Sequence, residues 1–522
     1  MKIVLVFIMS LQENNGQNYA TDELLCKTVD LPLGLGSIIA YSRQDPLIKR
    51  ECEFVNRIYI DTLSSDVIAD DILSQAPDLV GFSIHWTQEK EKSVWEIIKN
   101  KNSDIKIVLG GPGVPYDVES CRGMLNVHGQ IDALLMGEGE IAFRQLLKFY
   151  LKKESISNIP NAVLRERGKI FVNNVRVPLN DLSELPSPYL SGDVVLYDNA
   201  EGLLNVETSR GCGFHCAYCT YRGREKVRFF NIERFKQEIA FFKSKGFKGR
   251  LFITDPILNF NKEWARRVLK VMEGLDFRIH INMRPELIDN EIIELCAKMP
   301  KLELKVGIQS INPVALKNIN RPMNIAKCRE ILLNLVRNKI YTGIDLIIGL
   351  PGDNYETLKN AIDWAIYCRV QYIGLNELMV LPNSDLKEMC ERFEIKCNSN
   401  NIELSNYSFS EKDMAKASHF YVGFKFFLLH YRHIFHMLVF KCRYKPSEIV
   451  EKLIAEAKKR EEIPPCRLWD FSDINLSDQT VFCFFKSLLN DRQSVEYFFR
   501  VYKEKQKRLK DDENRVRSER IV

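Results

Sequence analysis

The sequence lacks any apolar run long enough to cross a membrane. A transmembrane helix needs roughly 18 uncharged apolar residues, and the nearest segment, residues 420–440, is interrupted by lysine, arginine and histidine. We therefore expect a packed helix there and no membrane span. The apolar run over residues 3–9 is short and meets no small-residue cleavage site, so it predicts a buried first strand rather than a secretory signal.

A strong excess of charge of one sign is also absent. The chain has 74 lysine and arginine residues against 69 aspartate and glutamate residues, a formal net charge of +5 over 522 residues. This small net charge does not indicate a nucleic-acid or membrane-surface partner, so we expect no nucleic acid among the partners. Without an export signal, the 14 cysteines are expected in the reducing cytoplasm, where clustered cysteines are more often metal ligands than disulfides.

The length exceeds what one hydrophobic core supports, and it predicts an α/β protein of two or three domains. Residues 1–150 alternate Val/Ile/Leu-rich runs with helix-length segments. Such strands are typical of a parallel sheet covered on both faces, so we expect a Rossmann-like, doubly wound domain whose ligands bind at the carboxyl ends of the strands. Its strands are expected at residues 2–8, 56–60, 78–84, 105–111 and 132–137.

The same alternation restarts after a polar connector. Residues 151–199 hold an expected hairpin at 162–174 and a linker rich in proline and serine. Six strand signals within residues 200–400 predict a partial (β/α)6 barrel with active-site loops after the strands. Residues 401–522 are expected to be mainly helical and to cap the barrel mouth. The barrel strands are expected at residues 203–209, 250–255, 278–283, 302–308, 342–350 and 374–381.

A cluster of three cysteines directly follows the first expected barrel strand. Cys212, Cys216 and Cys219 stand in C-x3-C-x2-C spacing. Three thiolates on one loop can hold an iron–sulfur cube, which normally takes four cysteines, so one iron is left open for a substrate. Zinc held by these thiolates and His215 is the alternative, although structural zinc usually draws ligand pairs from separate segments.

This segment resembles the radical S-adenosylmethionine (SAM) superfamily. The resemblance rests on the spacing, on Tyr218 just before the last cysteine, and on the position after a first barrel strand. It implies a 4Fe-4S cluster whose open iron chelates the methionine amino and carboxylate groups of SAM. Cleavage of the sulfonium then releases a 5′-deoxyadenosyl radical. Tyr218 matches the position whose backbone contacts the adenine.

Polar residues at the ends of later strands fit the same family. Asp255 stands where many members carry Gly-Gly-Glu, so it either holds the methionine amine or caps a strand end. Gln309 and Ser310 match positions that contact the ribose or carboxylate. Asp345 begins a stretch through Pro351 and Gly352 that resembles the adenine-binding segment, although the Pro-Gly pair is equally typical of a turn.

Two arginines are candidates for the cofactor carboxylate. Arg284 follows the third expected barrel strand, and Arg321 lies after the fourth. Each is expected either to pair with the carboxylate of SAM or to pair with acidic side chains at the surface.

The front domain resembles the cobalamin-binding class of this superfamily. Glycines at strand ends let a backbone approach a large flat ring, and the resemblance implies that Ser83, Gly110, Gly111, Gly137 and Glu138 contact the cofactor. It covers roughly residues 1–390. The segments that carry it are residues 31–36, 77–83, 110–112, 137–140 and 185–189.

A histidine that would coordinate cobalt from below is missing from its usual place. Between residues 9 and 55 there is no histidine, so the family's Asp-x-His-x-x-Gly segment does not occur. If cobalamin binds, His85 and Trp86 are the residues expected beneath the corrin, His85 as a ligand or Trp86 as a block to the lower face. The alternative is that both side chains simply pack at a strand end.

The resemblance implies a cobalamin-dependent radical SAM enzyme. The leading hypothesis is methylation of an unactivated carbon in a small-molecule or peptide natural product. The alternatives are a radical cyclase, rearrangement or oxidative enzyme in which cobalamin does not transfer a methyl group, and a non-catalytic iron–sulfur redox sensor. A flavodoxin- or ferredoxin-type electron donor is the implied partner.

Overall fold

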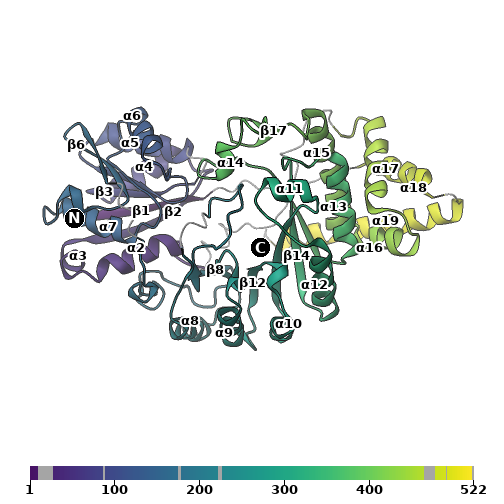
Figure 1. Ribbon diagram of the computed structural model, residues 1–522, viewed down its shortest axis with the longest axis horizontal. Helices are drawn as coiled ribbons and strands as arrows, with labels where there is room; N and C mark the ends of the chain where they lie inside the picture. Colours follow the sequence, from purple (N-terminus) through teal and green to yellow (C-terminus); the bar gives the residue numbers. More distant parts are fainter. Residues whose placement is uncertain are drawn as a thin grey trace.

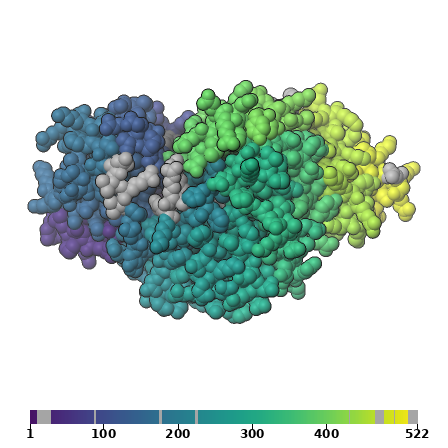
Figure 2. Space-filling model, in the orientation of Figure 1, coloured from purple at the N-terminus to yellow at the C-terminus, as the bar shows by residue number. Residues whose placement is uncertain are grey.

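The computed structural model describes three parts in sequence along the long axis of the molecule. Figure 1 shows the N-terminal sheet in purple and blue, the central sheet in teal and green, and the last helices in yellow, and Figure 2 shows the three packed against one another. The described residues are 1–9, 28–85, 89–173, 178–221, 226–463, 476–489 and 491–519, with the backbone alone described for 429–430 and 509–519.

The N-terminal sheet has seven strands in the order β2-β1-β3-β4-β5-β6-β7, of which the first five are parallel. Along β1, Ile3 and Leu5 join one core cluster, whereas Val4 and Val6 join the other. Both faces are thus covered, which confirms the predicted doubly wound domain. The parallel strands are β1 (Lys2–Met9), β2 (Glu53–Ile60), β3 (Leu79–Ser83), β4 (Lys106–Gly110) and β5 (Ala133–Leu135).

Helices cover this sheet on its two faces. The helices α2 and α7 pack together on one face, and α4 and α5 pack together on the other. The helices of this domain are α2 (Leu33–Arg43), α3 (Pro46–Glu51), α4 (Ser65–Ser74), α5 (Glu89–Lys101), α6 (Val118–Val127) and α7 (Glu140–Tyr150).

The hairpin expected in the connector belongs to the first domain. Its strands, β6 (Ala162–Glu166) and β7 (Lys169–Asn173), are antiparallel, and β6 pairs with β5. The sheet therefore extends to Asn173, beyond the expected boundary at residue 150. The hairpin satisfies the backbone groups that β5 would otherwise leave unpaired at a sheet edge.

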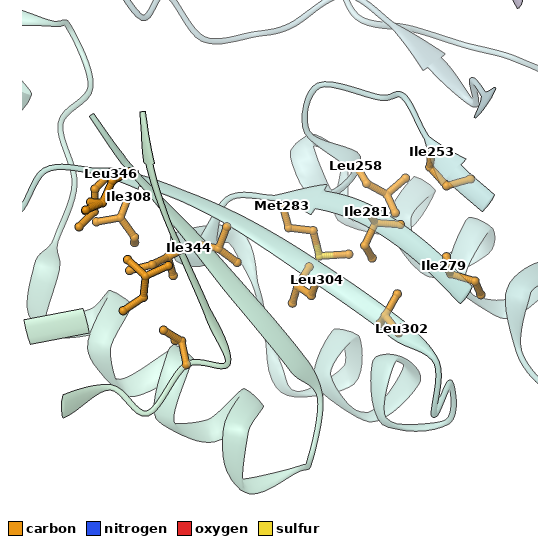
Figure 3. Packing of buried hydrophobic residues seen from close by; sticks show 14 of the residues in the cluster. Ile253, Leu258, Ile279, Ile281, Met283, Leu302, Leu304, Ile308, Ile344 and Leu346 are labelled. Atoms are coloured by element: carbon orange, nitrogen blue, oxygen red, sulfur yellow. The ribbon is translucent and has the colours of Figure 1, made fainter. Parts of the chain in front are cut away.

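The central sheet has six parallel strands in the order β15-β14-β13-β12-β11-β8, which confirms the predicted partial barrel. Along β13, Leu302 and Leu304 are buried, whereas Glu303 and Lys305 between them are partly exposed. Figure 3 shows the apolar side chains between the sheet and its helices. The strands are β8 (Leu203–Val206), β11 (Arg250–Ile253), β12 (Arg278–Met283), β13 (Leu302–Gln309), β14 (Tyr341–Ile348) and β15 (Tyr372–Glu377).

Charged side chains line the inner face of this sheet. Lys305 on β13 lies 3.0 Å from Asp345 on β14, and Arg250 on β11 lies 3.1 Å from Glu303 on β13. Closed (β/α)8 barrels fill this space with bulky apolar residues. A polar inner face instead suits a barrel that admits polar ligands between its strands.

Helices α8–α13 follow the barrel strands, and α14 follows β15. Their N-terminal caps explain several boundaries, because Asn231, Asn261, Asp289 and Asn324 each accept a hydrogen bond from the first turn. The helices are α8 (Ile232–Ser244), α9 (Lys262–Met272), α10 (Asn290–Ala297), α11 (Pro313–Asn318), α12 (Ile325–Arg337), α13 (Tyr355–Tyr367) and α14 (Asp385–Glu388).

The C-terminal segment divides into two parts. Residues 403–409 lie at the carboxyl ends of β14 and β15, where Asn406 Nδ2 donates to the Gly349 carbonyl at 2.8 Å. The helices instead pack on the outer flank of α13, where Ser447 N donates to Asp363 at 2.7 Å. Residues 403–409 of the segment expected to cap the barrel mouth thus lie at the strand ends, whereas α15 (Glu411–Lys425) and α17 (Pro446–Lys459) pack against α13.

The last elements are mainly helical. The chain bends at Tyr431 between two π-helical turns, Phe426–His430 and Met437–Lys441. Among the described helices, none combines the length and the apolarity that a bilayer crossing requires. The elements are β16 (Lys396–Cys397), β17 (Glu403–Ser405), α15 (Glu411–Lys425), α16 (Arg432–His436), α17 (Pro446–Lys459), α18 (Asp478–Leu488) and α19 (Arg492–Glu519).

Truncation of Leu304 should destabilise the barrel. The side chain is 1% exposed, so Leu304→Ala leaves a cavity and is expected to lower the free energy of unfolding by about 2–5 kcal/mol. Val314→Ala, at a side chain that is 53% exposed, should change it by less than about 0.5 kcal/mol. Urea unfolding followed by tryptophan fluorescence measures both, and equal shifts would contradict the assigned packing.

Candidate active site

The three predicted cysteines lie on one loop between β9 (Ser209–Arg210) and β10 (Arg228–Phe229), directly after β8. Backbone hydrogen bonds fix its middle. Ala217 N donates to the Ile319 carbonyl at 2.9 Å, and the Ala217 carbonyl accepts from Leu386 N at 2.7 Å. The loop is thus held against the segments that follow α11 and β15.

All three thiols are free, and each is at least partly buried. Burial raises the pKa of Cys212. Burial, together with the charges of the other two thiolates, raises the pKa of Cys219 to about 11. Without a cation, Cys212 and Cys219 are protonated at neutral pH, so binding of iron releases protons from these two thiols.

Arg321 lies beside Cys216. Its Nη1 donates to Cys216 Sγ at 3.3 Å and its Nη2 to the Gly307 carbonyl at 2.6 Å. Its Nε is buried and has no hydrogen-bond partner among the described residues. A buried cationic N–H without an acceptor, next to a cluster ligand, suits an anionic group such as a carboxylate.

Arg284 has its own partners. Its Nε donates to Glu286 at 2.6 Å, and its guanidinium lies 3.9 Å from the ring centre of Phe214 on the cysteine loop. The loop is packed closely here, since a Cβ on Gly213 would overlap the ring of Phe260. Arg284 is therefore engaged with an acid and an aromatic ring rather than directed at an open site.

Asp255, which follows β11, is fully buried and accepts four hydrogen bonds. The donors are Thr208 N at 2.7 Å, Thr208 Oγ1 at 2.6 Å, Ser209 N at 3.1 Å and Ser209 Oγ at 2.6 Å. Burial raises the pKa of Asp255, and these donors act in the opposite direction. The carboxylate is saturated, so the geometry favours the interpretation in which Asp255 fixes the start of the cysteine loop.

Three other predicted residues lie on or directly after the neighbouring strands β13 and β14. Gln309 lies at a bulge with φ of +70°, and Ser310 Oγ accepts from Asn312 N at 3.0 Å. Asp345 pairs with Gly307 and Gly374 in register on the two neighbouring strands. Its Oδ1 is buried without a hydrogen-bond partner in the described part of the chain, which suits a ligand that donates a hydrogen bond.

The described side chains around this loop do not form a binding site for a single metal ion. Within the described ranges, no three His, Cys, Asp or Glu side chains are close enough to share one ion. His215 is exposed, and its carbonyl accepts from Asn320 Nδ2 at 2.8 Å. The zinc interpretation, which needs His215 beside the three thiols, is therefore not supported, whereas a cube spreads its ligands farther apart than an ion does.

A cavity of about 490 Å³ lies between the N-terminal sheet and the cysteine loop. It is within the usual size range of cofactor pockets. Its walls come from the carboxyl ends of the first-domain strands and from both ends of the cysteine loop. The lining includes Ser83, Gly110, Gly111, Tyr116, Gly137, Glu138, Glu140, Glu207, Arg210, Gly211, Thr220 and Tyr221.

Glycines keep this cavity open. A Cβ at Gly34 or Gly110 would meet no heavy atom within 4 Å, so a side chain there would occupy the cavity itself. Gly111 has φ of +94°, and a Cβ there would lie 2.8 Å from the Ile84 carbonyl oxygen. Such a cradle suits a flat group held against the backbone.

The residues expected beneath the corrin are not both described. Trp86 lies outside the described residues. His85 is exposed, and its ring packs edge-on against Phe7 at 5.7 Å. No histidine is among the described residues that line the cavity.

Comparison with known proteins identifies the central domain. Residues 206–365 match the family model of the Radical SAM superfamily. We call residues 206–365, which this family model matches, the radical SAM domain. Its first strand, β8, leads into the three cysteines, and its end falls within α13.

Two curated relatives extend beyond the radical SAM domain. The cobalamin-dependent radical SAM methyltransferase TokK of Streptomyces tokunonensis is 25% identical over 70% of this chain and 56% of its own length. The 2-(S-pantetheinyl)-carbapenam-3-carboxylate methyltransferase of Streptantibioticus cattleyicolor is 25% identical over 68% and 54%. The chain thus spans little more than half the length of these relatives.

The fold resembles that of a solved enzyme across both domains. The cobalamin-dependent S-adenosylmethionine radical enzyme OxsB, with aqua-cobalamin and S-adenosylmethionine bound, aligns with a TM-score of 0.63. The alignment covers 100% of this chain and 81% of OxsB at 14% identity. This similarity concerns the arrangement of the Rossmann-like domain, the radical SAM domain and the C-terminal helices.

The sequence predicted Glu138 at the cavity, but it did not predict the charged side chains of Arg210, Arg228 and Glu207 that join the cavity to the radical SAM domain. Arg210 Nη1 lies 2.8 Å from Glu140, and Arg228 Nη1 donates to Glu138 at 3.0 Å. Glu207 completes the group through Arg210. The Glu-Gly-Glu segment was a visible signal, but no spacing in the sequence predicted the β9–β10 pairing that brings the arginines to it.

Substitution of Asp255 distinguishes its two interpretations. Asp255→Asn would face two of the four donors with an amide NH2, and an unsatisfied buried group costs about 1–3 kcal/mol. We expect a lower thermal midpoint and loss of bound iron on gel filtration. Asp289→Asn, at a cap on α10, is the matched control and should retain iron. Full iron retention with a weaker affinity for SAM alone would contradict the positioning role.

Proposed function

We propose that the protein is a cobalamin-dependent radical SAM methyltransferase that acts on an unactivated carbon of a small-molecule or peptide substrate. One observation carries this proposal. Gly211, Thr220 and Tyr221, at the two ends of the cysteine segment, line the cavity at the strand ends of the first domain. A cluster site and a flat-ring site therefore share a wall, as transfer between their two cofactors requires.

The residues of the radical SAM domain fit the cluster and its cofactor. Cys212, Cys216 and Cys219 would hold three irons of a 4Fe-4S cluster. The unpaired Nε of Arg321 would face the carboxylate of SAM, and the unpaired Oδ1 of Asp345 would accept from its ribose. Gln309 lies in the same region, whereas the methionine amine is left to groups other than Asp255.

The residues of the first domain fit a corrin. Gly110, Gly111 and Gly137 leave the backbone accessible at the ends of β4 and β5, and Ser83 lies beside Gly111. Bound at these sites, the cluster and SAM would supply a radical that takes hydrogen from carbon, and cobalamin would supply the methyl group. The chain would orient these groups, because the loop and the cavity lie together between two packed domains.

The relatives support methyl transfer over the alternatives. Two whose matches cover more than two thirds of this chain are named as methyltransferases, and we extend this activity, but not their substrates, to this chain. A flavodoxin or ferredoxin would supply the electron. A cyclase or oxidative reaction would yield 5′-deoxyadenosine without S-adenosylhomocysteine, so the two products distinguish the reactions.

Loss of one cluster ligand should abolish SAM cleavage. In anaerobically reconstituted Cys216→Ala, we expect 5′-deoxyadenosine formation to fall more than about 100-fold. Loss of a residue that only orients a metal ligand costs roughly 10- to 100-fold, and loss of the ligand itself should cost more. Mass spectrometry measures the product. Cys390→Ala, also half-buried and free, is the matched control, and an intact cluster in Cys216→Ala would refute the assignment.

Filling the cavity should prevent corrin binding while the cluster is retained. The side chain in Gly110→Leu would project into open space, so we expect cobalamin affinity to fall at least about tenfold, about 1.4 kcal/mol. The matched control is Gly123→Leu on α6, where a Cβ also meets nothing within 4 Å. Equilibrium dialysis measures both, and unchanged binding in Gly110→Leu would contradict the assigned site.

A further inference from the structure

Two arginines on the short β9–β10 ribbon reach across to the first domain. Arg210 and Arg228 are directly opposite in the antiparallel register. Arg210 Nη1 lies 2.8 Å from Glu140, the first residue of α7, and Arg228 Nη1 donates to Glu138 at 3.0 Å. The two paired arginines of the ribbon thus bind two acids of the first domain, Glu138 and Glu140, which are two residues apart in the chain.

Each arginine also makes hydrogen bonds outside the first-domain sheet, Arg210 within its own domain and Arg228 to the connector between the domains. Arg210 Nε and Nη2 donate to the two oxygens of Glu207, just after β8, at 2.8 and 2.7 Å. Arg228 Nη1 donates to the Leu179 carbonyl at 2.7 Å. We call Arg210, Arg228, Glu138, Glu140 and Glu207 the arginine clasp.

The clasp is buried, so its members cannot separate cheaply. The side chains of Arg210, Glu140 and Glu207 are 11%, 6% and 12% exposed. Removing one partner of a buried ion pair leaves a charge without compensation and is strongly destabilising. The paired groups should therefore move together, and a shift of the ribbon should be transmitted to the start of α7.

The clasp touches both proposed cofactor sites. The ribbon closes the ends of the loop that carries the cysteines, since β9 ends immediately before Gly211. Four of its members, Glu138, Glu140, Glu207 and Arg210, also line the 490 Å³ cavity. Burial raises the pKa of Glu138, but the hydrogen bond from Arg228 and the two arginine charges bring it below its usual range, so this acid stays ionised at neutral pH.

We propose that the arginine clasp couples the two sites, so that a cluster in the cysteine loop strengthens corrin binding in the cavity. This inference rests on the proposed function. A cluster would fix Cys212 and, through β9 just before it and the pairing of β9 with β10, both guanidiniums. The two guanidiniums hold Glu138 and Glu140 in the cavity wall, so the corrin would bind to side chains that are already ordered. The coupling is reciprocal, and bound corrin equally favours retention of the cluster.

A binding cycle on the full chain tests the coupling. The affinity for hydroxocobalamin is measured by equilibrium dialysis under anaerobic conditions, with the cluster reconstituted and with the iron removed by chelation. We expect at least about fivefold tighter binding in the cluster-loaded chain. In Glu140→Gln, the ratio of the two affinities should fall to within about twofold of one.

The ratio of the cobalamin affinities with and without the cluster distinguishes coupling through the clasp from a role of its residues in stability alone. A residue that only stabilises the fold would change both affinities and leave their ratio unaltered. Arg228→Lys keeps the charge but loses the paired geometry, and it should lower the ratio even if Glu140→Gln folds poorly. Glu303→Gln, which removes a partner of Arg250 within the barrel, is the matched control and should keep the ratio of the unmodified chain.

Two results would overturn the inference. One is equal affinity in the cluster-loaded and iron-free forms of the unmodified chain. The other is an unchanged ratio in both Glu140→Gln and Arg228→Lys. If the unmodified chain binds no corrin in either form, the proposed function itself fails, which is a different outcome from binding without coupling.

Discussion

The position of the cysteine loop depends on the hydrogen bonds between Asp255 and the end of β8. Asp255 follows β11 and receives four donors from Thr208 and Ser209, which lie three and four residues before Cys212 in the chain. This contact joins two adjacent barrel strands immediately below the loop. The junction thus fixes the start of the loop at Gly211, whereas the hydrogen bonds of Ala217 and the contact of Arg321 with Cys216 hold its middle.

Residues of both domains form the wall of the cavity. Glu138 and Glu140 belong to the first domain, yet their partners belong to the ribbon that closes the cysteine loop. A second joint lies on the other side, where Asn383 Oδ1 accepts from Tyr116 N at 3.0 Å. Contacts at two separate places restrict hinge motion between the domains, which suits chemistry that must keep two reactive centres at a fixed separation.

All six barrel strands could be predicted, with bounds that lie within four residues of the observed ones, because buried parallel strands are apolar on nearly every helix-facing position. The cluster cysteines and the glycines of the cavity were also predicted, since each follows such a strand at the same edge of its sheet. What could not be predicted depends on contacts distant in sequence. The hairpin at 162–173 joins the first sheet only because β5 offers an unpaired edge, and Asp255 is occupied only because β8 ends beside it.

Coordination at the fourth iron is the most direct test of the account. Electron–nuclear double resonance on the reduced cluster, with SAM carrying ¹⁵N in its methionine amino group, reports whether that nitrogen is bound to iron. The account predicts a ¹⁵N coupling that is present with labelled SAM and absent with unlabelled SAM. A cluster that shows no such coupling and is ligated by a fourth protein side chain would contradict it.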